Sequence, residues 1–367
     1  MVTSQYLTKF KLHQLKNLSF LLGLPVTLRK DALCETLAYG LNSTPPPDSF
    51  NKILSVDMGL RNLGICLLQV PHLTTIEGPL KNKHQSARNS APLTVTVWQK
   101  VDVLSQLGRK HGPDVSCSDH AAKEKREVSK IRIGKRGPTG VADFSAESLA
   151  KLAYPLVCDL LVKYKPSSIL IERQRHRSNG APTVQEWTVR VNLLEGMIWA
   201  CLETLRAQYG SGALCDSPLS RAVRELKAVA AVSPAKVAKF WCSGLSTEYK
   251  KEVESGESGT FRHEGRGVNK ISKADKIAVV QPWVDDWIAG GQRGSAQLDF
   301  AGAAAETATA FQSTVGKRKP RKKKGEDGEG EKSIGKLDDL ADCLLQGVAW
   351  VKWEENRQKL AEAVAKG

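Results

Sequence analysis

Acidic residues stand where two short apolar segments end. Residues 53–56 read Ile-Leu-Ser-Val before Asp57, and residues 168–171 read Ser-Ile-Leu-Ile before Glu172. Each segment has the length and composition of a buried strand, so each carboxylate is expected at the mouth of a sheet. A buried charge without compensation is costly, and a divalent cation would compensate both carboxylates. These positions predict a metal site.

A third acidic group opens the last predicted helix, which runs from about 336 to 363. It reads Asp-Asp-Leu-Ala-Asp over residues 338–342. Helical spacings of three and four place Asp342 on one face with both Asp339 and Asp338. By itself the run fits charges that complement the dipole at a helix N-terminus. Beside the two strand-end carboxylates it favours metal ligation, and the spacing leaves open whether Asp338 or Asp339 is the partner of Asp342.

The candidate ligands are all carboxylates, and no His or Cys cluster accompanies them. Hard oxygen ligands select Mg²⁺ or Mn²⁺ over zinc. Two such ions, roughly 3.5–4 Å apart and bridged by one carboxylate, promote in-line displacement at phosphorus. One ion activates the attacking water and the other stabilises the leaving 3′ oxygen.

Composition narrows the class of protein. The chain has 367 residues, a formal net charge of +15 and 41% hydrophobic residues. This length suggests two domains, or one large domain with insertions. No apolar run approaches the roughly 20 residues that cross a bilayer, which excludes an integral membrane protein. The positive charge favours nucleic acid as partner, with an anionic membrane surface second. None of the eight Cys forms a C-x-x-C pair, which argues against a zinc finger or a disulfide framework.

The predicted elements describe an α/β protein. Their order is three strands, helix, strand, helix, strand, helix and a terminal helix. The predicted strands cover about 53–57, 62–69, 93–98, 168–172 and 228–232, and the predicted helices about 145–164, 189–205, 235–242 and 336–363. Three insertions are expected at about 105–140, 243–270 and 290–335, and the last two read as disordered by composition.

A separate helical unit is predicted before these strands. Apolar residues recur at helical spacing from Leu7 to Leu22, Gly23-Leu24-Pro25 breaks the pattern, and a second helix begins at Lys30. Residues 1–42 resemble the SAP module, a DNA-binding helix pair. The other interpretation is a helical hairpin that packs on the main body. A Pro-rich linker at 43–51 follows.

Three blocks of sequence resemble the RNase H-like, RuvC-type nuclease core. They are residues 53–64, 169–174 and 336–342. Together with the SAP-like segment they resemble the fungal mitochondrial Holliday junction resolvases, which are cruciform-cutting endonucleases. The resemblance implies an RNase H-like mixed five-stranded sheet flanked by helices over residues 52–367. It also implies a homodimer in the mitochondrial matrix that binds four-way junction DNA and cuts it with paired, symmetric, ligatable nicks. Mg²⁺ or Mn²⁺, two ions per active site, would be the cofactor, with no membrane partner and no small-molecule cofactor.

The resemblance also assigns roles to single residues. Asp57 would bridge the metals and Glu172 would be the second ligand. Asp342 with Asp339 or Asp338 would complete the site, and the RuvC pattern of two Asp three apart favours Asp339.

Basic residues near these carboxylates are candidates for phosphate contacts, against the alternative of a solvated basic surface. Trp283 and Trp287, four apart on a helix, are expected to be core residues rather than base-stacking surfaces. The candidate DNA-binding residues are Arg61, Arg173, Arg175, Arg177, Lys270, Lys273, Lys276 and, in the helical unit, Lys30.

Other functions compete with this interpretation. An actin-like ATPase would need a second Gly-rich phosphate loop of the Asp-x-Gly-Gly type, which the sequence lacks. A ribonuclease H or a transposase shares the expected fold. A noncatalytic SAP-type DNA-binding protein would have no use for strand-end carboxylates at Asp57 and Glu172. The basic run 317–324 is expected to be a DNA-binding arm, with a nuclear import signal as the alternative.

Overall fold

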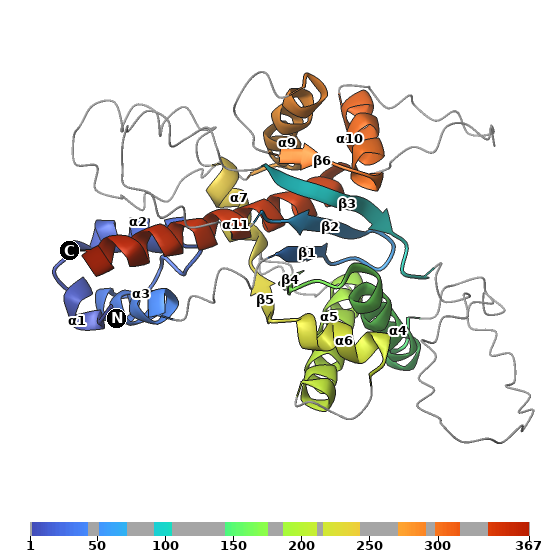
Figure 1. Ribbon diagram of the computed structural model, residues 1–367, viewed down its shortest axis with the longest axis horizontal. Coiled ribbons are helices and arrows are strands. Elements are labelled where there is room, and N and C mark those ends of the chain that lie inside the picture. Colours follow the sequence, from blue (N-terminus) through green and yellow to red (C-terminus); the bar gives the residue numbers. More distant parts are fainter. Residues whose placement is uncertain are drawn as a thin grey trace, which may run out of the picture.

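The fold is built on one mixed sheet. The computed structural model describes residues 2–42, 51–71, 92–104, 144–174, 186–210, 216–242, 271–290, 298–315 and 337–366. Within these ranges six strands form a sheet in the order β5-β4-β1-β2-β3-β6 (Figure 1). The strands are β1 (Lys52–Asp57), β2 (Leu63–Gln69), β3 (Leu93–Val101), β4 (Ser168–Glu172), β5 (Ala228–Val232) and β6 (Leu298–Phe300).

The strand directions bring the two strand-end carboxylates together. β1, β2 and β3 are joined antiparallel, whereas β4 runs parallel to β1 with Val56 beside Ile171. Parallel strands end at the same edge of a sheet. Asp57 and Glu172, each one residue beyond this pair, therefore lie side by side on adjacent strands. Side chains alternate between the faces of a strand, which puts both carboxylates on one face of the sheet.

Helices cover both faces of the sheet (Figure 1). One face packs on α4 (Ala146–Tyr164), α5 (Glu186–Tyr209) and α6 (Pro218–Glu225). The other face packs on α7 (Pro234–Cys242), α9 (Lys273–Ile288), α10 (Ala303–Thr314) and α11 (Leu337–Lys366). The mixed α/β architecture predicted from the sequence is confirmed. α6 was not predicted.

The N-terminal helices lie against the far end of α11 (Figure 1). They are α1 (Ser4–Leu7), α2 (Leu12–Leu21) and α3 (Lys30–Asn42), so the helix expected from Leu7 to Leu22 is interrupted at residues 8–11. Asn356 Nδ2 and Arg357 Nη2 each donate to the last carbonyls of α2, at Leu21 and Leu22, over 2.8 Å. The unit therefore packs on the main body, and its SAP-type DNA binding stays a prediction.

Two expectations about the sheet and its insertions are wrong. The sheet has six strands rather than five, because β6 pairs with β3 inside the segment 290–335 that was expected to be disordered. α10 follows it, with Ala304, Ala308 and Phe311 fully buried. Their spacing is helical, but a stretch rich in Ala, Gly and Thr hides it in the composition. The expected insertions at 105–140 and 243–270 and most of the linker lie outside the described residues.

None of the helices in the described ranges has the length and apolar character needed to span a bilayer.

The burial of α10 makes a stability prediction. Phe311 packs against Trp98, with ring centroids 5.1 Å apart, in the core under β3. We expect Phe311→Ala to lower the free energy of unfolding by about 3–5 kcal/mol, the usual cost of deleting a buried phenyl ring. Urea unfolding followed by tryptophan fluorescence measures it. Thr309→Ala, on the exposed side of the same helix, is the control, and equal effects of the two substitutions would contradict the placement of α10.

Candidate metal centre

The site begins at the end of β1. Asp57 is only 8% exposed, and its carboxyl group lies close to that of Glu172 at the end of β4. Burial and the nearby charge of Glu172 raise the pKa of Asp57 well above its usual range, and Asp342 and Asp339 raise it further. The four carboxyl groups of β1, β4 and α11 are therefore close enough to repel one another.

Close packing brings the start of α11 to this position. Gly64 on β2 pairs with Asp57, and a Cβ atom there would lie 2.7 Å from the carbonyl oxygen of Asp339 and 3.1 Å from the Asp57 Cβ. Only glycine leaves room for the helix backbone at that distance. The first turn of α11 thus lies directly on the β1–β2 hairpin.

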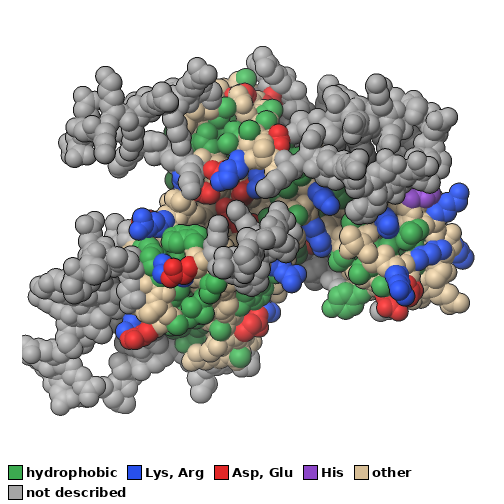
Figure 2. Space-filling view, turned by 180° about the vertical axis from the view of Figure 1, so that it is seen from behind, with side chains coloured by type: hydrophobic (Ala, Val, Ile, Leu, Met, Phe, Trp, Pro, Cys, Tyr) green, Lys and Arg blue, Asp and Glu red, His purple; other side chains and the backbone are tan. Residues whose placement is uncertain are grey.

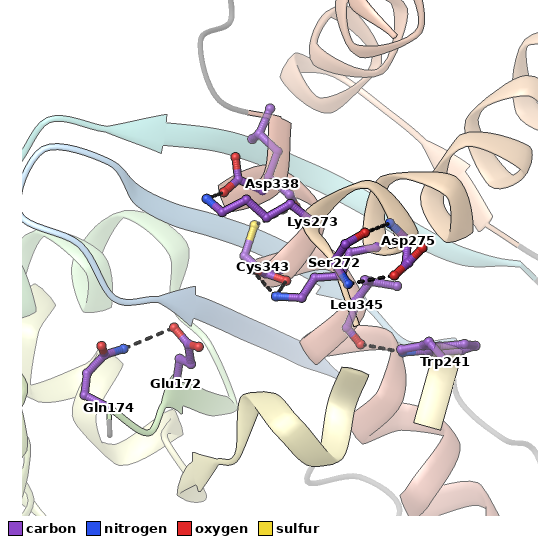
Figure 3. Close-up of polar contacts among 12 residues, drawn as sticks. Glu172, Gln174, Trp241, Ser272, Lys273, Asp275, Asp338, Cys343 and Leu345 are labelled. Carbon is purple, nitrogen blue, oxygen red and sulfur yellow. Dashed lines mark hydrogen bonds and ion pairs between the residues drawn. The ribbon is translucent and has the colours of Figure 1, made fainter. Parts of the chain in front are cut away.

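Two lysines of α9 form ion pairs with acidic residues of α11, and Figure 3 labels one pair, Lys273 and Asp338. The ammonium group of Lys273 donates to the carboxylate of Asp338, and Lys276 Nζ lies 2.7 Å from a carboxylate oxygen of Asp342. The hydrogen bond to Asp338, together with the charge of that carboxylate, raises the pKa of Lys273 against the opposing effect of burial. On the back of the molecule, acidic side chains lie in a recess with Lys and Arg side chains directly beside them (Figure 2).

The charged form of Asp342 remains unfavourable although Lys276 lies beside it. Burial raises its pKa from 3.8 to about 6, against the attraction of Lys276, and the charges of Glu172 and Asp338 raise it as well. Desolvation therefore outweighs the single cation beside it.

This donor set fits a hard divalent cation. It consists of carboxylate oxygens from three elements, and their mutual repulsion is what bound positive charge would relieve. Within the described ranges no three His, Cys, Asp or Glu side chains already stand at ligand spacing around one point. Asp338 and Asp342 instead face Lys273 and Lys276.

The predicted DNA-binding residues fall at several places. Lys273 and Lys276 are at the carboxylates, and Arg61 and Arg173 are exposed in the segments that follow β1 and β4. Lys30 belongs to the N-terminal unit, where its ammonium group donates to the Thr8 carbonyl over 2.7 Å. Three further candidates lie outside the described residues: Arg175, Arg177 and Lys270.

The predicted core role of the two tryptophans is confirmed. Trp283 and Trp287 are partly buried on α9 and pack against the core between the sheet and α11. Trp287 Nε1 also donates to Asp299 Oδ1 over 3.1 Å, which ties α9 to β6.

Sequence reasoning missed three polar residues around the carboxylates. Gln174 Nε2 donates to Glu172 Oε2 over 3.1 Å (Figure 3), and its backbone N–H donates to Glu195 Oε2 over 3.0 Å. Burial raises the pKa of Glu195 on α5. The third is Gln346, which lies on α11 one turn after Asp342. A glutamine inside an otherwise apolar helical run was the signal available for it.

A family model described as "Mitochondrial resolvase Ydc2 / RNA splicing MRS1" matches residues 53–360. The chain belongs to this family. All five candidate ligands lie inside the matched range, whereas α1, α2 and α3 precede it.

Two relatives of this family resemble the chain. The curated protein "Cruciform cutting endonuclease 1, mitochondrial" of Schizosaccharomyces pombe (strain 972 / ATCC 24843) is 28% identical over 190 residues, which are 52% of this chain and 54% of that protein. The match thus spans about half the length of the relative. The crystal structure of the yeast mitochondrial Holliday junction resolvase Ydc2 aligns with a TM-score of 0.51 and 22% identity, over 97% of this chain and 98% of that chain. That likeness shows the shared fold.

The raised pKa of Asp342 predicts how stability depends on pH without metal. A carboxyl group whose pKa rises from 3.8 to about 6 on folding stabilises the fold fully below pH 3.8 and loses this effect as the pH rises through 6. The loss is on the order of 3 kcal/mol. In EDTA, we expect wild type and Asp342→Asn to differ little near pH 4 and the variant to be the more stable by about this amount near pH 8. Urea unfolding at each pH measures it, and a difference independent of pH would contradict the raised pKa.

Proposed function

We propose that this protein is a divalent-metal-dependent endonuclease that cuts four-way DNA junctions. One observation carries the proposal. Asp57, Glu172 and the carboxylates of α11 converge on one face of the sheet although their charges repel one another. Buried like charges destabilise a fold unless a cation binds them, so a protein without metal chemistry has no use for them. The two relatives named above are a cruciform cutting endonuclease and a Holliday junction resolvase by name, which supports the junction as substrate.

The carboxylates would share the work of holding the metal. Asp57 lies between Glu172 and α11, which suits a bridging ligand, and Glu172 would be the second ligand with Gln174 fixing its orientation. Asp339 and Asp342 are the α11 residues whose charges raise the pKa of Asp57, which supports them over Asp338 as the remaining pair. Bound Mg²⁺ or Mn²⁺, as two ions, would activate the attacking water and stabilise the leaving oxygen.

The lysines of α9 would serve the substrate. A cation held by Asp342 would compete with Lys276 for the same carboxylate oxygens, and the ammonium group of Lys276 would then be available to a phosphate beside the site. Lys273 is in the same position toward Asp338. Arg61 and Arg173 are exposed near the ends of the two carboxylate strands and would contact the DNA backbone. Lys30 would do so from the N-terminal unit.

Symmetric cutting needs two sites. This chain supplies one carboxylate cluster within the described residues, and a four-way junction is cut at two phosphates, so we propose a homodimer. The descriptions of the matched family and of both relatives include the word mitochondrial. We therefore propose that this chain acts in the mitochondrial matrix.

The first experiment uses purified protein, Mg²⁺ and a labelled four-way junction. We expect Asp57→Asn to bind the junction as wild type does and to cut it at least about 100-fold more slowly, because it removes a charge that the metal requires. Gel shift and denaturing gels measure binding and cleavage. Matched duplex, an RNA–DNA hybrid and single strands run alongside.

The other outcomes identify the rival functions. Cleavage of the hybrid alone would indicate a ribonuclease H, and binding without cleavage in any metal would leave a DNA-binding protein. Binding of structured RNA without cleavage would place the chain with the splicing branch that the family description names. A supercoiled plasmid that extrudes a cruciform tests the homodimer, since paired cuts within one complex give linear DNA and single cuts give nicked circles.

The role of Lys276 has its own signature. We expect Lys276→Met to lower the cleavage rate at saturating metal by about tenfold, or about 1.4 kcal/mol. Its affinity for Mn²⁺ should not fall, because the variant removes a competing cation. Lys163→Met, at an exposed position of α4 near the start of β4, is the control. An unchanged rate for Lys276→Met would exclude its contact with the reacting phosphate.

A further inference from the structure

Gln346 is a polar residue on the buried face of α11. It is 3% exposed, and its neighbours Leu345, Gly347 and Val348 belong to an apolar stretch of the helix. Its amide nitrogen lies 3.1 Å from Ser55 Oγ, 3.2 Å from the Val56 carbonyl oxygen and 3.3 Å from the Leu170 carbonyl oxygen. One side chain thus touches three acceptors on two strands.

These acceptors lie just before the carboxylates in the two strands. Ser55 and Val56 immediately precede Asp57 on β1, and Leu170 lies two residues before Glu172 on β4. Ser55 and Leu170 are paired across the two strands. Gln346 itself follows Asp342 by four residues, on the same face of α11. The amide therefore links all three elements that carry the candidate ligands, one helical turn below the site.

Packing leaves the amide little freedom to move. A Cβ atom at the neighbouring Gly347 would lie 3.3 Å from the Ser55 Cβ and 2.5 Å from the Leu68 Cδ1, so α11 lies directly on β1 and β2 here. An apolar side chain of the same length would fill this space without the desolvation of an amide. The amide is better explained by the geometry that it imposes than by the volume that it fills.

We propose that Gln346 is a positioning residue for the metal centre, setting the separation of β1, β4 and α11 so that their carboxylates can share a cation. The inference deepens the function proposed above and rests on it for its activity readout. Residues that orient metal ligands typically change metal affinity by about 10–100-fold when they are lost.

The test measures Mn²⁺ affinity by electron paramagnetic resonance on the full-length protein. Gln346→Met keeps the length of the side chain and removes its donors, and we expect it to weaken Mn²⁺ binding by about tenfold or more. The Mn²⁺ concentration for half-maximal junction cleavage should rise by the same factor, and excess Mn²⁺ should restore most of the rate. Gln99→Met is the matched control, because Gln99 Nε2 also donates within the fold, to the Tyr164 hydroxyl over 2.9 Å. It should leave Mn²⁺ affinity unchanged.

A second variant covers the case in which Gln346→Met does not fold. Ser55→Ala removes one acceptor and leaves the glutamine in place, and a smaller loss of Mn²⁺ affinity is expected. In the double variant the two losses should fall short of additivity, since both remove the same contact.

The outcomes separate this inference from the proposed function. Unchanged Mn²⁺ affinity in folded Gln346→Met, or in Ser55→Ala if the first variant is unfolded, would overturn the positioning role, as would wild-type protein that binds no Mn²⁺. Weakened Mn²⁺ binding in the variant, together with a wild type that cuts no junction, would support the positioning role and overturn the endonuclease.

Discussion

The seating of α11 on the β1–β2 hairpin is the packing constraint on which the site depends. Gly64 of β2 and Gly347 of the helix leave no space for a Cβ atom at the contact, so the helix axis lies as near the sheet as backbone atoms permit. Two indole N–H groups donate to carbonyls of the helix. Trp98 donates to the Leu340 carbonyl over 2.8 Å. Trp241 donates to the Leu345 carbonyl over 3.0 Å (Figure 3). Once the helix is seated there, its first turn can only project its carboxylates toward the ends of β1 and β4.

That geometry works against stability and in favour of cation binding. Burial and like charge together raise the pKa values of Asp57 and Asp342, so the site without metal holds protons more tightly than isolated carboxyl groups would. Lys273 and Lys276 offset part of the negative charge from α9. In the proposed function the same lysines couple metal binding to DNA binding. A metal ion in the carboxylate cluster would release the ammonium groups of the two lysines from their ion pairs, and these groups could then bind a phosphate of the DNA. Metal and polyanion then favour each other's binding through one set of ion pairs.

The sequence predicted the parts of this arrangement that follow from local pattern. Asp57 and Glu172 were found because a buried strand that ends on a carboxylate is visible in a short window, and Asp338, Asp339 and Asp342 because helical spacing is local as well. β6 and α10 were missed because only pairing with β3 and burial of Phe311 give that Ala-rich segment its structure. Gln346 was missed for a related reason: its three acceptors lie 176 to 291 residues away in the chain. No local pattern records a contact of that separation.

The length of α11 adds a consequence for the N-terminal unit. The helix carries Asp338 and Asp342 at one end, and near its other end Asn356 and Arg357 cap the last carbonyls of α2, roughly 25 Å away along the axis. Lys236 of α7 adds a third hydrogen bond, to the Gly23 carbonyl over 3.1 Å. Rotating the unit against the main body would break these three hydrogen bonds. DNA bound by the N-terminal unit in the proposed function would therefore reach the carboxylates in a fixed orientation, because one continuous helix holds both.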